Sequence, residues 1–125
     1  MGKRFASLVG SPAPLIALAA IIILSGCQTK YAGSGPLQIS PAVSNYFQLY
    51  MNDSQRAALA VSLDGKCASY RFCSAVAGVC AEGDEAYFTK RGCESSCKKS
   101  CGVLAVGSTI VWDGPVTDSD GNDLN

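Results

Sequence analysis

The amino-acid sequence predicts a small α+β domain, an antiparallel sheet with two helices held together by disulfides, behind a signal peptide and a flexible tether. Three observations favour this fold class. Two stretches have apolar residues at helical spacing, two β-prone stretches surround tight-turn dipeptides, and six cysteines lie between residues 67 and 101.

The first 26 residues have the anatomy of a secretory signal. Lys3 and Arg4 supply positive charge, residues 15–24 form an uncharged apolar run, and the small Ser25 and Gly26 follow. A transmembrane helix is the competing interpretation, but a span needs about 20 apolar residues. Residues 1–26 are therefore interpreted as a leader that is removed.

The leader ends in Leu24-Ser25-Gly26-Cys27, which resembles the lipobox of bacterial lipoproteins. The resemblance implies that a diacylglyceryl group is attached to the Cys27 thiol, that the chain is cut before it, and that the new amine receives an acyl chain such as palmitate. Two or more acyl chains make a durable membrane anchor. Gln28 is not the aspartate of an inner-membrane retention signal, so the resemblance favours the outer membrane over the inner one.

Composition excludes several classes of function. The chain has ten cations and ten acids, and removal of Lys3 and Arg4 with the leader leaves an acidic excess. No basic surplus is present to bind a nucleic-acid backbone. Histidine is absent, which removes the commonest general base and metal ligand.

Seven cysteines are an odd number for an exported chain. Assignment of Cys27 to lipid leaves six, which an oxidising compartment favours pairing. Because two cysteines one helical turn apart pair poorly, our preferred pairing is one of 15 possibilities: Cys67–Cys97, Cys73–Cys80 and Cys93–Cys101. No CxxC motif is present, so we expect no metal, no cofactor and no thiol–disulfide catalysis.

The mature chain divides into a lipidated flexible tether (27–39), a folded domain (40–114) and a disordered acidic tail (115–125). Ser40 and Pro41 predict the start of a helix that ends near Asn52-Asp53. Its apolar stripe consists of Val43, Tyr46, Phe47 and Tyr50.

The dipeptide Asp64-Gly65 predicts a hairpin with a type I′ turn. The register then places Val61 opposite Ala68, Leu59 opposite Tyr70, and Ala57 opposite Phe72. One face carries large apolar side chains (Leu59, Val61, Tyr70, Phe72). The other carries mainly small ones (Ala58, Ala60, Ser62, Cys67, Ser69, Cys73).

Residues 74–83 are interpreted as a loop, and a second helix is expected over residues 84–98, with Phe88 turned away from its cysteines and Gly102 as a stop signal. Residues 103–112 form either a hairpin turning at Gly107-Ser108 or one long strand. We expect the cysteine-bearing helix on the small-residue face of the sheet and the aromatic helix near the other face.

Signals for catalysis are weak. No GxSxG motif occurs, and the acids Asp64, Glu82, Asp84, Glu85 and Glu94 have structural explanations as turn or helix-end residues. Residues 118–123 superficially resemble an acidic calcium loop, but glycine stands fourth rather than sixth. Trp112 is either a partner anchor or a core residue. We expect no catalytic residues and no enzyme.

The sequence thus predicts a non-catalytic envelope lipoprotein that contacts an envelope protein or cell-wall polymer and reaches the membrane through lipid on Cys27. One alternative is an inhibitor or immunity-type lipoprotein that blocks a secreted hydrolase with loop 74–83; another is a small enzyme with two convergent carboxylates. The pattern from residues 58–61 through Cys93 to residues 103–106 loosely resembles small exported bacterial domains of unknown function.

Overall fold

The computed structural model describes residues 30–73 and 84–125 and has the predicted α+β class. The signal peptide, Cys27, loop 74–83 and Cys80 lie outside the described residues. The elements in chain order are β1 (Leu37–Gln38), α1 (Pro41–Asn52), β2 (Arg56–Ser62), β3 (Ala68–Phe72), α2 (Glu85–Cys97), β4 (Cys101–Val106), β5 (Thr109–Ile110) and β6 (Val116–Thr117).

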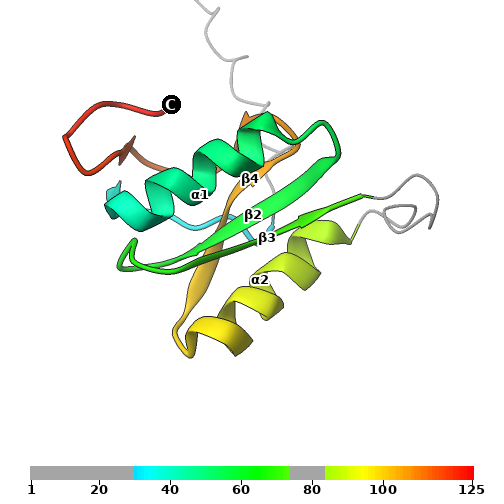
Figure 1. The fold of residues 1–125 in the computed structure, drawn as a ribbon. Coiled ribbons are helices and arrows are strands. Elements are labelled where there is room, and N and C mark those ends of the chain that lie inside the picture. The colour runs from blue at the N-terminus through cyan, green and yellow to red at the C-terminus, as the bar shows by residue number, and fades with distance from the viewer. Residues whose placement is uncertain (1–29, 74–83) are drawn as a thin grey trace, which may run out of the picture.

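The main sheet is four-stranded and antiparallel in the order β3-β2-β4-β5, and β1 pairs in parallel with β6. Helices α1 and α2 cover opposite faces of the main sheet (Figure 1). Among the described residues, no helix is both long and apolar enough to cross a bilayer.

Strand β2 lies at the centre of the molecule, and every one of its residues from Ala57 to Ser62 is buried. Leu59 and Val61 pack in one hydrophobic cluster with Val43, Phe47 and Tyr50 of α1. Ala60 packs in a second cluster with Cys93 of α2 and Cys101 of β4. The predicted division into a large-residue face under α1 and a small-residue face under α2 is confirmed.

Helix α1 begins as predicted. The Ser40 hydroxyl accepts a hydrogen bond from the Val43 N–H at 3.2 Å, and Pro41 occupies the first turn. At the far end of the buried stripe, the Tyr50 hydroxyl donates to the carbonyl of Gly107 at 2.6 Å. This bond links α1 to the β4–β5 turn, and burial raises the pKa of Tyr50 to about 12.

The β2–β3 hairpin has the predicted register at Leu59–Tyr70 and Val61–Ala68. A bulge between Arg56 and Ala58 shifts the far end, so that Arg56 rather than Ala57 pairs with Phe72.

The predicted type I′ turn is wrong, because Gly65 (φ 74°) has a positive φ and Asp64 does not. The Asp64 carboxylate accepts from the Ser62 hydroxyl at 2.6 Å and from the Lys66 N–H at 3.0 Å. Local side-chain bonds of this kind stabilise a different turn in which glycine alone is left-handed.

The hairpin between β4 and β5 turns at Gly107-Ser108 as expected, with Val106 opposite Thr109. The predicted helix stop at Gly102 is wrong. Helix α2 ends at Cys97, in agreement with the range of residues 84–98 predicted for it, because Lys98 adopts a left-handed conformation (φ 57°) and its N–H donates to the Glu94 carbonyl. Gly102 lies in β4, where a Cβ would lie 2.5 Å from the Cα of Gly33.

The flexible tether predicted for residues 27–39 is wrong from residue 30 onward. The Val103 N–H donates to the Tyr31 carbonyl at 2.9 Å, and the Gly33 N–H donates to the Val103 carbonyl. Leu37 and Ile39 are buried in the main core. The segment looked like a linker because its few apolar residues show no periodicity, yet they bury area against residues distant in sequence.

The disordered tail predicted for residues 115–125 is also wrong. Val116 is fully buried and pairs with Leu37, and the Leu124 N–H donates to the Val116 carbonyl. Trp112, just before this segment, is 5% exposed, and its indole N–H donates to the Gly35 carbonyl at 2.8 Å. These contacts favour the core role of Trp112 and extend the domain to residues 30–125.

Replacement of Gly65 by alanine should destabilise the protein more than the same change at Gly107. Both glycines have positive φ, a conformation that costs an L-residue about 1–2 kcal/mol. A Cβ at Gly65 would lie 2.0 Å from the Gln38 carbonyl oxygen, whereas nothing lies within 4 Å at Gly107. Urea unfolding should show Gly65→Ala less stable than Gly107→Ala by about 1–3 kcal/mol, and equal losses would contradict this packing.

Candidate functional site

The cysteines of α2 meet Cys67, just before β3, and Cys101 of β4 beside the small-residue face. Cys67 is bonded to Cys97 with a Cα–Cα distance of 6.0 Å, and Cys93 is bonded to Cys101 with a Cα–Cα distance of 6.2 Å. These are two of the three pairs that we proposed from the sequence. Cys73 is also disulfide-bonded.

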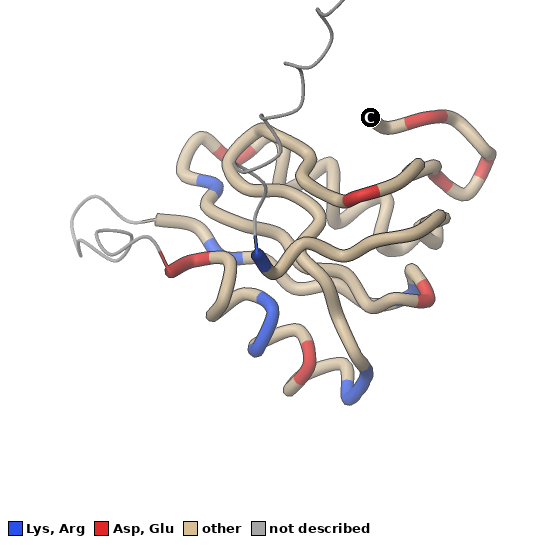
Figure 2. The backbone as a smooth tube through the Cα atoms, turned by 180° about the vertical axis from the view of Figure 1, so that it is seen from behind, with Lys and Arg blue, Asp and Glu red and all other residues tan. Residues whose placement is uncertain are grey.

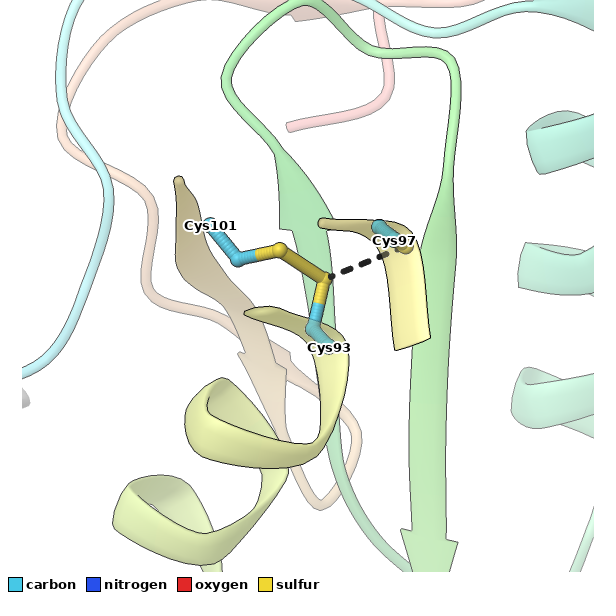
Figure 3. Close-up of side chains that lie close together, drawn as sticks. All are labelled: Cys93, Cys97 and Cys101. Atoms are coloured by element: carbon cyan, nitrogen blue, oxygen red, sulfur yellow. Dashed lines mark hydrogen bonds between the residues drawn. A yellow bond between two sulfur atoms is a disulfide. The ribbon is translucent and has the colours of Figure 1, made fainter. Parts of the chain in front are cut away.

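The two described disulfides lie next to each other, and Figure 3 shows the Cys93–Cys101 bond with Cys97 beside it. The Sγ atoms of Cys93 and Cys97, one turn apart on α2, are 3.9 Å apart without being bonded to each other. Cys93 and Cys101 are buried against Ala60. The alanine and serine side chains of β2 let α2 approach closely enough for both bonds, so the disulfides fix this helix to the β2–β3 connection and to β4.

Three of these sulfur atoms, from Cys93, Cys97 and Cys101, lie within 4.8 Å of one another, the spacing of a metal site. A metal binds the thiolate form of cysteine. Each of the three sulfurs is instead bonded in a disulfide. In this oxidised state the cluster is a covalent link between elements.

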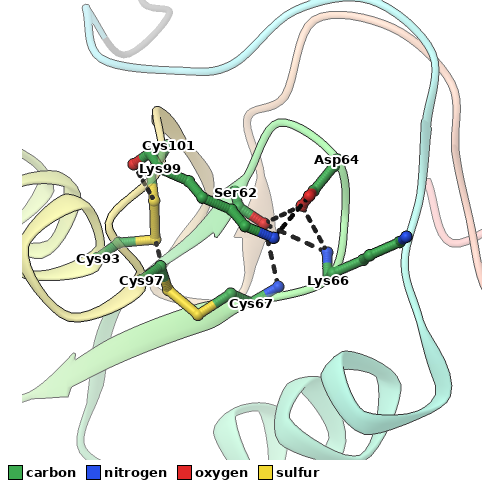
Figure 4. A network of polar contacts seen from close by, with 8 residues as sticks. All are labelled: Ser62, Asp64, Lys66, Cys67, Cys93, Cys97, Lys99 and Cys101. Atoms are coloured by element: carbon green, nitrogen blue, oxygen red, sulfur yellow. Dashed lines mark hydrogen bonds and ion pairs between the residues drawn. A yellow bond between two sulfur atoms is a disulfide. The ribbon is translucent and has the colours of Figure 1, made fainter.

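A polar network adjoins the disulfides at the β2–β3 turn (Figure 4). The Lys99 ammonium lies 2.7 Å from the Asp64 carboxylate, which also accepts from the Ser62 hydroxyl and the Lys66 N–H. These hydrogen bonds, with Lys99 the largest contribution, hold the pKa of Asp64 well below its usual range. The network ties the hairpin turn to the α2–β4 connection.

The hydrogen bond between Ser62 and Asp64 has a structural explanation. The Ser62 hydroxyl donates to Asp64 and accepts from the Lys66 and Cys67 N–H groups, so its hydrogen-bonding capacity is used. A depression of ≈ 460 Å³ lies beside the turn, and of the described acids only Asp64 lines it. The two convergent carboxylates that a glycosidase needs do not meet in this depression.

The acidic C-terminal segment has a structural explanation as well. One oxygen of the Asp118 carboxylate accepts from the Asp120 and Asn122 N–H groups at 2.9 Å, and the other accepts from the Asn122 amide at 3.1 Å. Bonds to the backbone and side chain of Asn122 contribute most to the lowered pKa of Asp118. Its oxygens are therefore engaged in a turn.

Sequence reasoning missed a surface of three neighbouring aromatic rings, each with one cation over it, which we call the aromatic–cationic patch. Tyr87 and Phe88 of α2 are 37% and 50% exposed, and their ring centroids are 5.3 Å apart. The only sequence signal was that Phe88 lies off the buried face of α2. The patch consists of Lys30, Tyr31, Arg71, Tyr87, Phe88 and Arg91.

Replacement of both Cys67 and Cys97 by alanine should lower the free energy of unfolding by about 3.5 kcal/mol. The bond spans 30 residues of sequence, and the unfolded chain gains the corresponding loop entropy when the bond is absent. Urea unfolding under non-reducing conditions measures the change. A loss below about 1 kcal/mol would contradict the role of this disulfide in fixing α2.

Acidification should destabilise the protein partly through Asp64. The folded-state pKa of Asp64 lies below the unfolded value of about 3.9. The contribution of the ionised carboxylate to the free energy of unfolding is therefore complete above about pH 3.9 and is lost as the pH falls through the folded-state pKa. Asp64→Asn should therefore reduce the fall in unfolding free energy between about pH 5 and pH 2.

Lys99→Met is the matched comparison for Asp64→Asn, because it removes the cation and leaves the Ser62 and Lys66 hydrogen bonds. The pH dependence of its free energy of unfolding should lie between those of the wild type and Asp64→Asn. Identical pH dependence in all three proteins would show that the network does not stabilise the folded state.

Comparison with known proteins adds no family to these observations. No protein-family model matches the chain, and no curated protein or solved structure matches it significantly. The resemblance of residues 24–27 to a lipobox stays an interpretation of the sequence, and the function has to be argued from the chain's own residues.

Proposed function

We propose that the protein is an exported lipoprotein of the bacterial cell envelope, anchored by acyl chains on Cys27, whose folded domain is a non-catalytic structural or interaction module. The partner is an envelope protein or a cell-wall polymer. The outer membrane is favoured over the inner one because Gln28, rather than aspartate, follows the lipid site.

One observation carries the proposal: all five cysteines that the structure describes are disulfide-bonded. Disulfides persist in oxidising compartments such as the periplasm and are rare where glutathione and thioredoxin keep thiols reduced. Oxidation of every cysteine in the described part of the domain is consistent with export by the leader of residues 1–26. It also fits a cysteine count in which Cys27 is reserved for lipid.

The polar groups of the domain support a role without catalysis. Asp64, Ser62 and Asp118 each have their oxygens engaged in hydrogen bonds that hold turns together. Glu94 accepts from Lys90 and from the Cys101 N–H. These bonds give the polar groups structural roles, which favours a module that works by surface contact.

Cys27→Ser should abolish metabolic labelling by a fatty-acid analogue and leave an unprocessed precursor, because the substituted side chain lacks the sulfur that accepts lipid. Labelling is followed by in-gel detection and processing by mass spectrometry of the intact protein. The Cys67→Ala, Cys97→Ala double variant is the control and should still be labelled. Continued labelling of Cys27→Ser would overturn the anchor.

A further inference from the structure

The folded domain begins close to the proposed lipid site. Residues 30–39 pack on the sheet, so only residues 28 and 29 separate Cys27 from Lys30. Three Cα–Cα steps of 3.8 Å span at most about 11 Å. This inference rests on the proposed function: a lipid on Cys27 would hold the surface around Lys30 directly against the bilayer.

The surface around Lys30 is the aromatic–cationic patch. The Lys30 ammonium lies 5.3 Å from the centroid of the Tyr31 ring, and that ring lies 5.4 Å from the ring of Tyr87. Contacts through Tyr87 continue along α2 to Phe88. A connected series of rings therefore leads from the start of the described chain to the exposed side of α2.

An arginine lies over each of the two patch rings that α2 contributes, Tyr87 and Phe88. The Arg91 guanidinium lies 5.9 Å from the Tyr87 ring centroid, and the Arg71 guanidinium lies 5.4 Å from that of Phe88. The acids Asp84 and Glu85 stand at the start of α2 and the basic residues follow along its middle (Figure 2). Glu94, one turn after Arg91, is paired with Lys90 at 2.9 Å. The three cations of the patch therefore exceed the remaining acids of this helix, Asp84 and Glu85, by one.

This composition fits the surface of an anionic bilayer. Amphipathic aromatic rings concentrate at membrane–water interfaces, where an apolar body and a polar edge are both accommodated. Basic side chains near an anionic leaflet gain attraction from its surface potential. Cell-wall glycans also stack on aromatic rings, but the short link to Cys27 and the positive balance favour phospholipid.

We propose that the aromatic–cationic patch is the membrane-facing surface of the domain. Tyr87 and Phe88 enter the boundary between headgroups and acyl chains, and Lys30, Arg71 and Arg91 contact the phosphates of anionic phospholipids. The opposite side of the sheet, covered by α1, faces away from the bilayer and is left for a protein or cell-wall partner.

Fluorescence quenching by brominated phospholipid tests this orientation. The processed, lipidated protein is reconstituted into vesicles of brominated phosphatidylcholine with phosphatidylglycerol, as wild type, Phe88→Trp and Leu49→Trp. Leu49 is the matched control because it is 61% exposed on α1, on the other face of the sheet. We expect the added fluorescence of Phe88→Trp to be quenched strongly and that of Leu49→Trp to be nearly unchanged.

A charge test accompanies the quenching. Arg91→Glu is introduced into the Phe88→Trp background, and the quenching at position 88 reports how often the patch contacts the bilayer. The ratio of patches in contact with the bilayer to patches away from it should fall by at least about fivefold, the effect of one basic residue at an anionic surface. Lys66→Glu, at the exposed β2–β3 turn, is the control and should have little effect. Equal effects of the two substitutions would contradict recognition of headgroups by the patch.

Vesicle flotation separates failure of this inference from failure of the proposed anchor. If the processed protein does not float with vesicles, the lipid anchor is wrong. If it floats but Phe88→Trp is quenched no more than Leu49→Trp, the anchor stands and the membrane-facing patch is overturned. Quenching confined to Leu49→Trp would reverse the orientation and equally overturn it.

Discussion

The close approach of α2 to β2 is the contact on which the rest of the structure depends. The face of β2 toward α2 carries alanine and serine, so the helix can bury Cys93 against Ala60. This approach brings the sulfur atoms of Cys93 and Cys97 within bonding distance of Cys101 and Cys67. Larger side chains on that face would lift α2 and separate the cysteines.

The other face of β2 supports a different part of the structure. Leu59 and Val61 form the floor of the main core, and α1 covers it with Val43, Phe47 and Tyr50. Segments from both ends of the described chain complete this core, with Leu37 and Ile39 from one and Val116 from the other. Because the N-terminal segment is part of the core, little chain remains between the domain and Cys27.

The short link changes what an anchor at Cys27 would do. A flexible tether of thirteen residues, 27–39, would let the domain turn freely above a bilayer, at a reach of about 20 Å. A link that consists of residues 27–29 alone would instead restrict which surface of the domain can meet the bilayer. The aromatic–cationic patch lies beside the start of the described chain because Tyr31 contacts Tyr87, a residue 56 positions further along the chain. The sequence alone could not show this proximity.

Local patterns in the sequence were sufficient for the regular elements. The Ser40-Pro41 start of α1, the Val61–Ala68 register and the Gly107-Ser108 turn depend on residues close to one another in the chain. The type of turn at Asp64-Gly65 was not predictable from the dipeptide. It depends on the carboxylate bonds to Ser62, Lys66 and Lys99, and Lys99 arrives from a distant part of the sequence.

By itself, the sequence determined the α+β class, the two faces of β2 and the lipobox-like start, because each follows from the identity and spacing of neighbouring residues. Only the tertiary structure decided that residues 30–39 and 115–125 belong to the domain, and that Lys30, Tyr31, Arg71, Tyr87, Phe88 and Arg91 form one surface. The physical reason is that short irregular segments have no periodicity of their own. They become ordered by burying a few side chains, such as Leu37 and Val116, against partners far away in sequence.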